Sequence, residues 1–259
     1  GKIRRDGALV LGDNGELSGV NDSVVSDDGE QLTYNAEEIA MLEQSQTQAE
    51  YKALQVIFRY ARLLTDDGAD SVAYVPISNA HIDGCTYIGP GGLEFVRRLV
   101  AAGGKVRVPT TLNSVSADRR RWQALQVPAD RAKASIALGD AYLDLGCQPS
   151  FTCAPYLLPS PPSLGQDIAW GESNAVVFAN SVLGAKTEKL ADYLDICCAI
   201  SGIVPAVGVH LPHNRRPSVL LDAQSIISEL SGIENAQNLD MLFPILGHLC
   251  GSLSDGKVP

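Results

Sequence analysis

Two short apolar runs flank a helical segment within about forty residues, and this arrangement restricts the possible folds more than any other feature of the chain. The runs are residues 71–77 (SVAYVPI) and 105–109 (KVRVP), and apolar residues recur at helical spacing over 91–102 before Gly103 and Gly104. A strand, a helix and a strand in so short a stretch predict a parallel pair with a right-handed crossover. The sequence therefore predicts an α/β fold built on parallel βαβ units.

The segments that follow the two predicted strands carry polar side chains. Loops that leave parallel strands emerge at the same edge of a sheet, where α/β proteins place their sites. After the first strand, His81 and Asp83 could act as an acid–base or orienting pair, or could form only an Asx turn. After the second strand, Asn113 could hold a substrate carboxylate or hydroxyl, or could cap a helix. We expect these two loops to converge.

Three further helices are expected. The first begins at Asn35 with Glu38 three residues on, close to a capping box, and extends to about residue 65 with a break near Gln46. The others cover 130–145, closed by Gly146, and 187–200. Residues 218–221 (SVLL) are expected to form a strand, and a short helix and an apolar run are expected in the last forty residues.

Two more polar segments lie in the second half of the chain. Residues 147–166 form a loop rich in Pro and Ser, and loops of this length in a compact domain are usually functional. Its Cys153 could be a metal-cluster ligand, although no second cysteine lies at a usual ligand spacing. Glu172 and Ser173 precede an apolar helix, where they could aim a carboxylate and a hydroxyl at a ligand or could simply start the helix.

Composition excludes several classes of function. The 259 residues carry a formal charge of -10, which argues against nucleic-acid binding because that requires clustered Lys and Arg. No apolar run has the length of a membrane span, and the first residues lack the apolar core of a signal peptide. Six cysteines without regular spacing indicate a reducing compartment, in which the thiols are free, buried or metal-bound. We therefore expect a cytoplasmic protein that binds neither nucleic acid nor membrane.

Four segments together resemble the catalytic (large) domain of aconitase X, the divergent dehydratase branch of the aconitase superfamily. In chain order they are HIDGCTY (81–87), VPTTLN (108–113), TCAPY (152–156) and AWGESNAVVFANSVLGAKT (169–187). The resemblance implies an aconitase-like layered α/β fold. Residues 35–259 would then form the N-terminal portion of the catalytic domain, with the C-terminal part of that domain missing. Residues 1–34 would be a linker or the tail of an upstream swivel domain.

The resemblance also implies site residues. The substrate-contact segments of the family correspond here to Gly84, Cys85, Thr86, Asn113, Ser114, Glu172 and Ser173. The cluster cysteine corresponds to Cys153, which implies an iron–sulfur cluster whose other ligands come from the missing part. The candidates for a catalytic role are His81, Asp83, Glu172 and Ser173, and the resemblance does not identify the base.

The implied activity is the removal of water from a small hydroxy acid. The combination Asp83-Gly84-Cys85 favours the cis-3-hydroxy-L-proline dehydratase branch of the family. One alternative is a phosphomevalonate-type dehydratase subunit. The other is a non-catalytic remnant that binds a carboxylate ligand or a partner. The small swivelling domain of the family is the expected partner, in cis or in trans.

Overall fold

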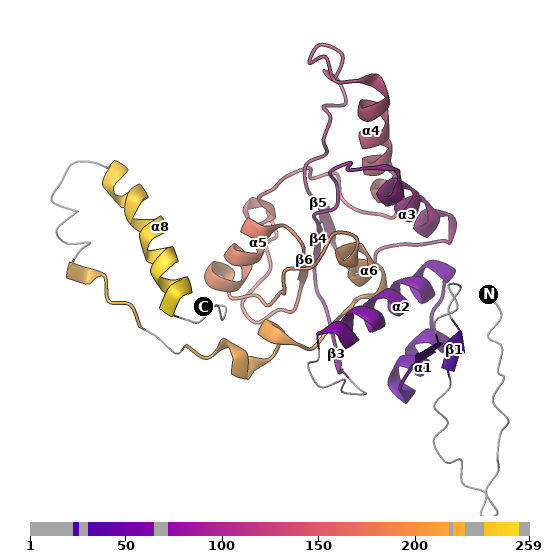
Figure 1. The fold of residues 1–259 in the computed structure, drawn as a ribbon, viewed down its shortest axis with the longest axis horizontal. Helices are drawn as coiled ribbons and strands as arrows, with labels where there is room; N and C mark the ends of the chain where they lie inside the picture. The colour runs from indigo at the N-terminus through magenta and orange to yellow at the C-terminus, as the bar shows by residue number, and fades with distance from the viewer. Residues whose placement is uncertain (1–22, 26–30, 65–71, 218–219, 226–235, 254–259) are drawn as a thin grey trace, which may run out of the picture.

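A three-stranded parallel sheet lies at the centre of the protein (Figure 1). The computed structural model describes residues 23–25, 31–64, 72–217, 220–225 and 236–253. In the sheet, β4 (Ala80–Ile82) lies between β5 (Thr110–Leu112) and β6 (Ala169–Trp170). His81 is the register partner of both Thr111 and Trp170, so these three residues form one row across the sheet.

The predicted βαβ unit is present, but its two strands were placed too early in the sequence. Helix α3 (Pro90–Ala101) connects β4 to β5, and the two strands are parallel as predicted. The run 71–77 instead contributes β3 (Tyr74–Pro76), which pairs antiparallel with β7 (Ile203–Pro205). The run 105–109 leads into β5 with alternate residues exposed, whereas every residue of β4 and β5 is buried. The two apolar runs therefore precede the central strands β4 and β5 and do not form them.

The predicted break in the N-terminal helical segment is confirmed. Helix α1 (Ala36–Glu43) ends before Gln46, and α2 (Gln48–Leu63) follows. Asn35 and Glu38 form a reciprocal capping box, in which each side chain accepts the main-chain N–H of the other residue, at 2.9 and 3.1 Å. A buried apolar stripe of α2 packs against α6 (Leu194–Ser201).

Helix α6 begins later than predicted. The sequence suggested a helix over 187–200 with Thr187 as its cap, but residues 187–193 are irregular. The Thr187 hydroxyl accepts the main-chain N–H of Trp170 at 3.0 Å, and Tyr193 adopts a left-handed conformation with φ of 70° that interrupts the helix. All eight residues of α6 are buried, and the helix packs against the central sheet.

The remaining elements surround this centre. Helix α4 (Ala129–Asp144) packs against α3, and Gly146 with φ of 96° follows it as predicted. Strands β1 (Ser23–Val25) and β2 (Gln31–Thr33) form an antiparallel pair. The shorter helices are η1 (Pro155–Leu157), α5 (Ser173–Phe178), the π-helix η2 (Ala179–Leu183), η3 (Gly208–His210) and η4 (Pro212–Arg215).

The described part of the C-terminal segment includes helix α8 (Ala236–Leu253), whereas residues 226–235 lie outside the described residues. The Phe243 and Ile245 side chains of α8 are exposed. Of the predicted strand 218–221, residues 218–219 lie outside the described residues, and 220–221 are not in a strand. In the described part of the chain, no helix combines the length and the apolar character needed to cross a membrane.

Candidate active site

Three polar side chains meet just beyond the carboxyl ends of the central strands. Asp83, Asn113 and Glu172 each come two residues after one member of the row that contains His81. Residues two apart in a strand point to the same face of a sheet, so the three side chains form the next row on that face. The predicted convergence of the first two loops is confirmed, because the Asn113 amide lies 2.8 Å from the Asp83 carboxylate. We call Asp83, Asn113 and Glu172 the polar row.

Asn113 joins the two carboxyl groups of the polar row. Its Nδ2 donates hydrogen bonds to Oδ1 of Asp83 and to Oε2 of Glu172. Its own Oδ1 accepts the main-chain N–H of Ser114 at 2.7 Å, which determines which end of the amide faces the carboxyls. One buried amide therefore holds two acidic groups from different strands side by side.

The two carboxyl groups have different proton affinities. Burial and, after it, the adjacent Asp83 together raise the pKa of Glu172 to about 7. Burial also acts against ionisation of Asp83, but hydrogen bonds from Glu172 and Asn113 and the positive charge of Lys189 bring the pKa of Asp83 below its usual value. Two carboxyls in one site favour a single shared proton. Near neutral pH the pair can therefore both accept and donate a proton.

A buried aspartate in α6 forms a hydrogen bond with the main chain of the polar row. Asp195 is fully buried, and its carboxylate accepts the main-chain N–H groups of Asp83 and Ile196, both at 2.7 Å. Gly171 packs against the same point, because a Cβ atom there would lie 2.8 Å from Cβ of Asp83 and 2.9 Å from Oδ2 of Asp195. The close approach of β4, β6 and α6 thus requires a glycine at this position. The sequence analysis identified neither Asp195 nor this role of Gly171.

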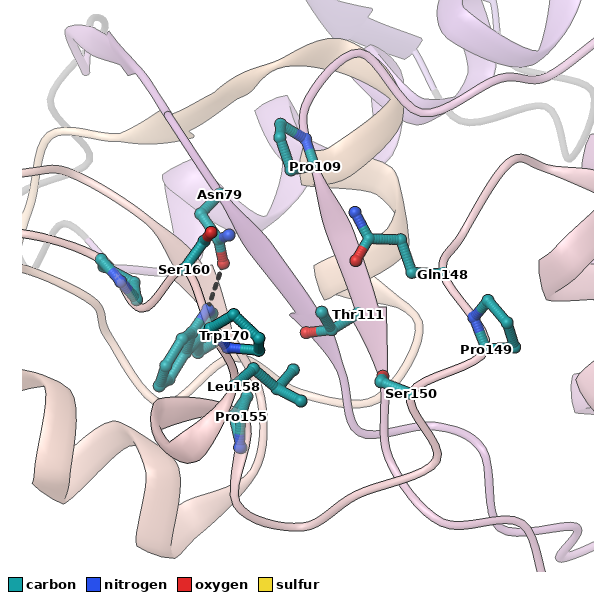
Figure 2. Close-up of a pocket in the computed structure, with 12 residues that line it drawn as sticks. Asn79, Pro109, Thr111, Gln148, Pro149, Ser150, Pro155, Leu158, Ser160 and Trp170 are labelled. Atoms are coloured by element: carbon teal, nitrogen blue, oxygen red, sulfur yellow. Dashed lines mark hydrogen bonds between the residues drawn. The ribbon is translucent and has the colours of Figure 1, made fainter.

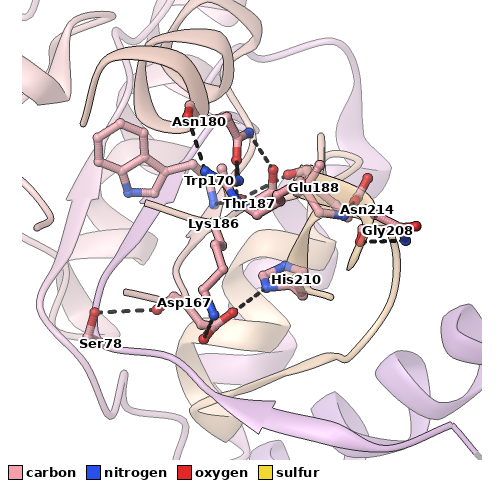
Figure 3. A network of polar contacts seen from close by, with 12 residues as sticks. Ser78, Asp167, Trp170, Asn180, Lys186, Thr187, Glu188, Gly208, His210 and Asn214 are labelled. Carbon is pink, nitrogen blue, oxygen red and sulfur yellow. Dashed lines mark hydrogen bonds and ion pairs between the residues drawn. The ribbon is translucent and has the colours of Figure 1, made fainter. Parts of the chain in front are cut away.

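Lys189 adds a positive charge to the site. Its Nζ lies 3.4 Å from Oδ2 of Asp83 and donates to the main-chain carbonyl of Leu190 at 3.1 Å. The segment that carries Lys189 belongs to a polar network in which Thr187 bonds to Trp170 (Figure 3). Sequence reasoning missed Lys189 as well, because a single lysine in an irregular segment matches no local pattern.

His81 lies one row behind the polar row and is fully buried. Its Nδ1 lies 2.8 Å from the Thr111 hydroxyl, which in turn donates to the carbonyl of Ala80. The other ring nitrogen, Nε2, has no hydrogen-bond partner among the described residues. Burial lowers the pKa of His81 to about 4, so the ring is neutral at neutral pH. No hydrogen bond joins the His81 and Asp83 side chains, which the sequence suggested as a pair.

The residues that follow Asp83 differ in exposure. Gly84 is buried, and its carbonyl accepts the Tyr142 hydroxyl at 3.0 Å. The Cys85 thiol is fully buried 3.5 Å from the carbonyl of Ile82, and burial raises its pKa well above the usual value. Thr86 is exposed. Of these three predicted contact residues, only Thr86 presents its side chain to solvent.

Three other predicted residues lie on the exposed rim of the site. Ser114 and Ser173 are exposed, and Glu172 precedes α5 as predicted. Cys153 is exposed too, with its Sγ 3.5 Å from Oγ of Ser114. The side-chain amide of Asn174 donates to the Cys153 carbonyl at 2.9 Å and so fixes the loop to α5. The structure therefore brings the TCAPY segment to the same edge of the sheet as the polar row.

The thiol chemistry fits one ligand of an iron–sulfur cluster. Cys153 is an exposed cysteine next to Ser114 at the edge of the polar row, and cysteine thiolates are the usual ligands of such clusters. Within the described ranges, however, no three His, Cys, Asp or Glu side chains are grouped to hold a metal. Cys85, Cys147, Cys197 and Cys198 are buried. A cluster at Cys153 would therefore need ligands beyond those that the described residues supply.

A cavity of about 430 Å³ lies on the same face of the sheet, beneath the predicted Pro/Ser-rich loop (Figure 2). Thr111 and Trp170 line it from the row that contains His81, and Trp170 Nε1 donates to Oδ1 of Asn79 at 2.8 Å. The loop contributes prolines, serines and Leu158. The lining residues are uncharged, so the charged groups of the site are confined to the polar row and its neighbours.

Comparison with known proteins agrees with this architecture. The family model "Aconitase X first domain" matches residues 31–213. The chain is 44% identical over 238 residues to cis-3-hydroxy-L-proline dehydratase of Pseudomonas aeruginosa, with 92% of this chain and 38% of that protein covered. The corresponding protein of Hypocrea jecorina is 42% identical, with 89% of this chain and 37% of that protein covered.

More distant relatives share the fold. The phosphomevalonate dehydratase large subunit of Methanothermobacter thermautotrophicus is 36% identical, covering 71% of this chain and 44% of that one. The crystal structure of Thermococcus kodakaraensis aconitase X (holo-form) superposes with a TM-score of 0.59 at 33% identity, covering 71% of this chain and 45% of that chain. The chain thus spans less than half the length of each of these proteins. With a family match over residues 31–213 and a shared α/β fold, the chain belongs to the aconitase X family.

Proposed function

We propose that this chain forms part of a hydro-lyase that removes water from a small hydroxy acid, with cis-3-hydroxy-L-proline as its substrate. One observation carries the proposal: Asn113 holds Asp83 and Glu172 side by side, and burial raises the pKa of Glu172 to about 7. The identities of 44% and 42% to cis-3-hydroxy-L-proline dehydratases, against 36% to a phosphomevalonate dehydratase large subunit, support this choice of substrate.

The carboxyl pair suits an elimination. A base removes the proton from C2, next to the carboxylate, and the electron pair of that C–H bond forms the C2–C3 double bond. The C3–O bond breaks, and the departing hydroxyl leaves as water once it has gained a proton. Ionised Asp83 can take the C2 proton, and protonated Glu172 can protonate the departing hydroxyl. The Asn113 amide holds the two groups in place during these transfers.

An iron–sulfur cluster is the proposed cofactor, with Cys153 as one ligand. Such a cluster would supply a Lewis acid for the departing hydroxyl. Cys153→Ala in the protein that contains this chain is expected to lower the iron and sulfide content without unfolding it, because Cys153 is exposed. Cys250→Ala is the matched control, since Cys250 lies in α8. Unchanged iron and sulfide in Cys153→Ala would exclude this ligand.

The partner and the location are proposals of the same kind. A swivel domain, in cis or in trans, is the proposed partner, and residues 1–34 would be its tail or a linker. The relative named a large subunit supports a two-part assembly. All six cysteines are free, which supports a cytoplasmic location in a reducing environment.

The test is water elimination by the protein that contains this chain. We expect turnover of cis-3-hydroxy-L-proline to an unsaturated cyclic imino acid, measured by its ultraviolet absorbance. Glu172→Gln is expected to lower kcat by about 10²- to 10⁴-fold, as for loss of a general acid. Glu94→Gln, which removes an exposed carboxylate on α3, is the control. Turnover of phosphomevalonate alone would move the assignment to the other branch, and full activity in Glu172→Gln would refute the role of the carboxyl pair.

A further inference from the structure

The ammonium group of Lys189 lies beside the polar row and forms only a long ion pair with Asp83. Its Nζ lies 3.4 Å from Oδ2 of Asp83, and 47% of its side-chain surface is exposed. By contrast, Lys186 pairs with Asp167 at 2.7 Å with a side chain only 19% exposed. A long, half-exposed ion pair holds weakly and can exchange its partner. Lys189 is therefore available to an anion that enters the site.

Hydrogen bonds fix the segment around Lys189 to neighbouring parts of the protein. The Thr187 hydroxyl accepts the main-chain N–H of Trp170, two residues before Glu172. The Glu188 carboxylate accepts the main-chain N–H of Val209 at 2.6 Å (Figure 3). Nζ of Lys189 itself donates to the carbonyl of Leu190. A binding group on a segment fixed in this way loses little freedom when a ligand arrives.

A positive charge is needed in the site to offset the repulsion between the Asp83 carboxylate and the carboxylate of a hydroxy acid. A hydroxy acid brings its own carboxylate next to Asp83, whose low pKa keeps it ionised. Two carboxylates at close range repel each other unless a positive charge lies between or beside them. An ammonium group has three N–H donors, and the contacts of Lys189 with described residues use two of them. The third can reach an incoming carboxylate.

We propose that Lys189 binds the carboxylate of the substrate and thereby brings C2 next to Asp83. This inference rests on the proposed function, since it names the group that recognises the acid of that same substrate. The substrate carboxylate is attached to C2. When Lys189 binds it, the C2–H bond therefore lies close to the Asp83 carboxylate. Lys189 is then a substrate-binding residue that also sets the orientation for proton removal.

The test compares two ligands that differ in one group. Cis-3-hydroxy-L-proline and its carboxamide share the ring, the hydroxyl and the ring nitrogen, and only the acid carries the carboxylate. Their Kd values are measured by calorimetry with the wild-type protein that contains this chain and with its Lys189→Met, Lys189→Arg and Lys105→Met variants. Lys105 is the matched control because it is an exposed lysine before β5, at the end of that strand remote from the polar row.

The wild-type protein is expected to bind the acid more tightly than the amide. Lys189→Met is expected to lose about tenfold to a hundredfold in affinity for the acid, while its affinity for the amide changes little. Lys189→Arg should restore part of the preference, and Lys105→Met should match the wild type. If Lys189→Met keeps the full preference for the acid, Lys189 is not the carboxylate site, although the proposed function stands. If the wild-type protein that contains this chain binds neither ligand, the proposed function itself fails.

Discussion

The main-chain N–H of Asp83 donates a 2.7 Å hydrogen bond to the buried carboxylate of Asp195. Asp83 follows a central strand, whereas Asp195 lies in the first turn of α6, where the helix dipole favours an anion. The site is thereby attached to the most deeply buried helix of the protein rather than to surface loops. Changes at Asp195 or next to it should therefore alter the position and the proton affinity of Asp83.

Gly171→Ala should destabilise the protein. The added Cβ would lie 2.8 Å from Cβ of Asp83 and 2.9 Å from Oδ2 of Asp195, so one of these groups must move. Overpacking of this kind costs about 1–3 kcal/mol in the free energy of unfolding, measured in urea. Gly91→Ala is the control, because a Cβ at Gly91 meets no heavy atom within 4 Å and alanine favours helix α3. Equal stability of the two variants would contradict the close packing at Gly171.

Asp195→Asn should remove a pH dependence of stability. Burial raises the pKa of Asp195 to about 7, above its unfolded value of 3.8, so the native state binds a proton that the unfolded state has released. The contribution of Asp195 to the free energy of unfolding should therefore fall as pH rises from about 4 to 7. Asparagine does not titrate, and its NH₂ must face one of the two N–H donors, which costs about 1–3 kcal/mol.

The measurement for Asp195→Asn is urea unfolding at several pH values between 4 and 8. The gap in stability between wild type and variant should widen as the pH falls through this range. Glu172 titrates in the same direction in both proteins, so the comparison isolates Asp195. Asp130→Asn, at an exposed position in α4, serves as control. Parallel curves for the wild type and Asp195→Asn would show that Asp195 does not titrate differently in the two states.

His81→Gln should remove a pH dependence of the opposite sign. Burial lowers the pKa of His81 from 6.5 to about 4, so the unfolded chain binds a proton that the native state does not. The contribution of His81 to the free energy of unfolding is therefore lost as pH falls from about 6.5 to 4. Urea unfolding should show that the free energy of unfolding of the wild type, relative to that of His81→Gln, decreases as the pH falls through this window. His213→Gln, at an exposed position, should behave as the wild type does.

Asn113→Ala should raise the pKa of Glu172 above about 7 and that of Asp83 with it. The Asn113 amide donates to both carboxylates, and each hydrogen bond favours the ionised form. Side-chain carboxyl carbons followed by NMR as a function of pH report both values. Asn174→Ala removes a nearby amide that bonds to the Cys153 carbonyl instead, and it should leave both pKa values in place. Unchanged titration in Asn113→Ala would rule out the bridging amide.

The sequence predicted the meeting of Asp83 and Asn113 although it misplaced both strands. Topology alone brings the carboxyl ends of parallel neighbours to one edge, and a shift of a few residues along the strands preserves that relationship. The capping box at Asn35 and the end of α4 near Gly146 were also predictable, because local residue types determine both.

The contacts that support the site could not be predicted from local patterns. Asp195 and Lys189 each reach Asp83 across more than one hundred residues of sequence. The late start of α6 has the same origin, since Thr187 bonds to Trp170 on another strand instead of capping a helix. Neither composition nor periodicity carries information on pairings over such distances. The requirement for glycine at 171 likewise follows only from the closeness of its neighbours.

The row geometry of the sheet has a consequence for how such a chain can change in length during evolution. His81, Thr111 and Trp170 are in register across the sheet. Asp83, Asn113 and Glu172 share a face because each follows one of these residues by two positions. A single-residue insertion or deletion between His81 and Asp83, or at the equivalent point of β5 or β6, would reverse the parity and turn one member of the row to the opposite face. The loop over 147–166 lies outside this count. A change in the length of that loop leaves the parity intact, whereas the three two-residue spacings should stay invariant.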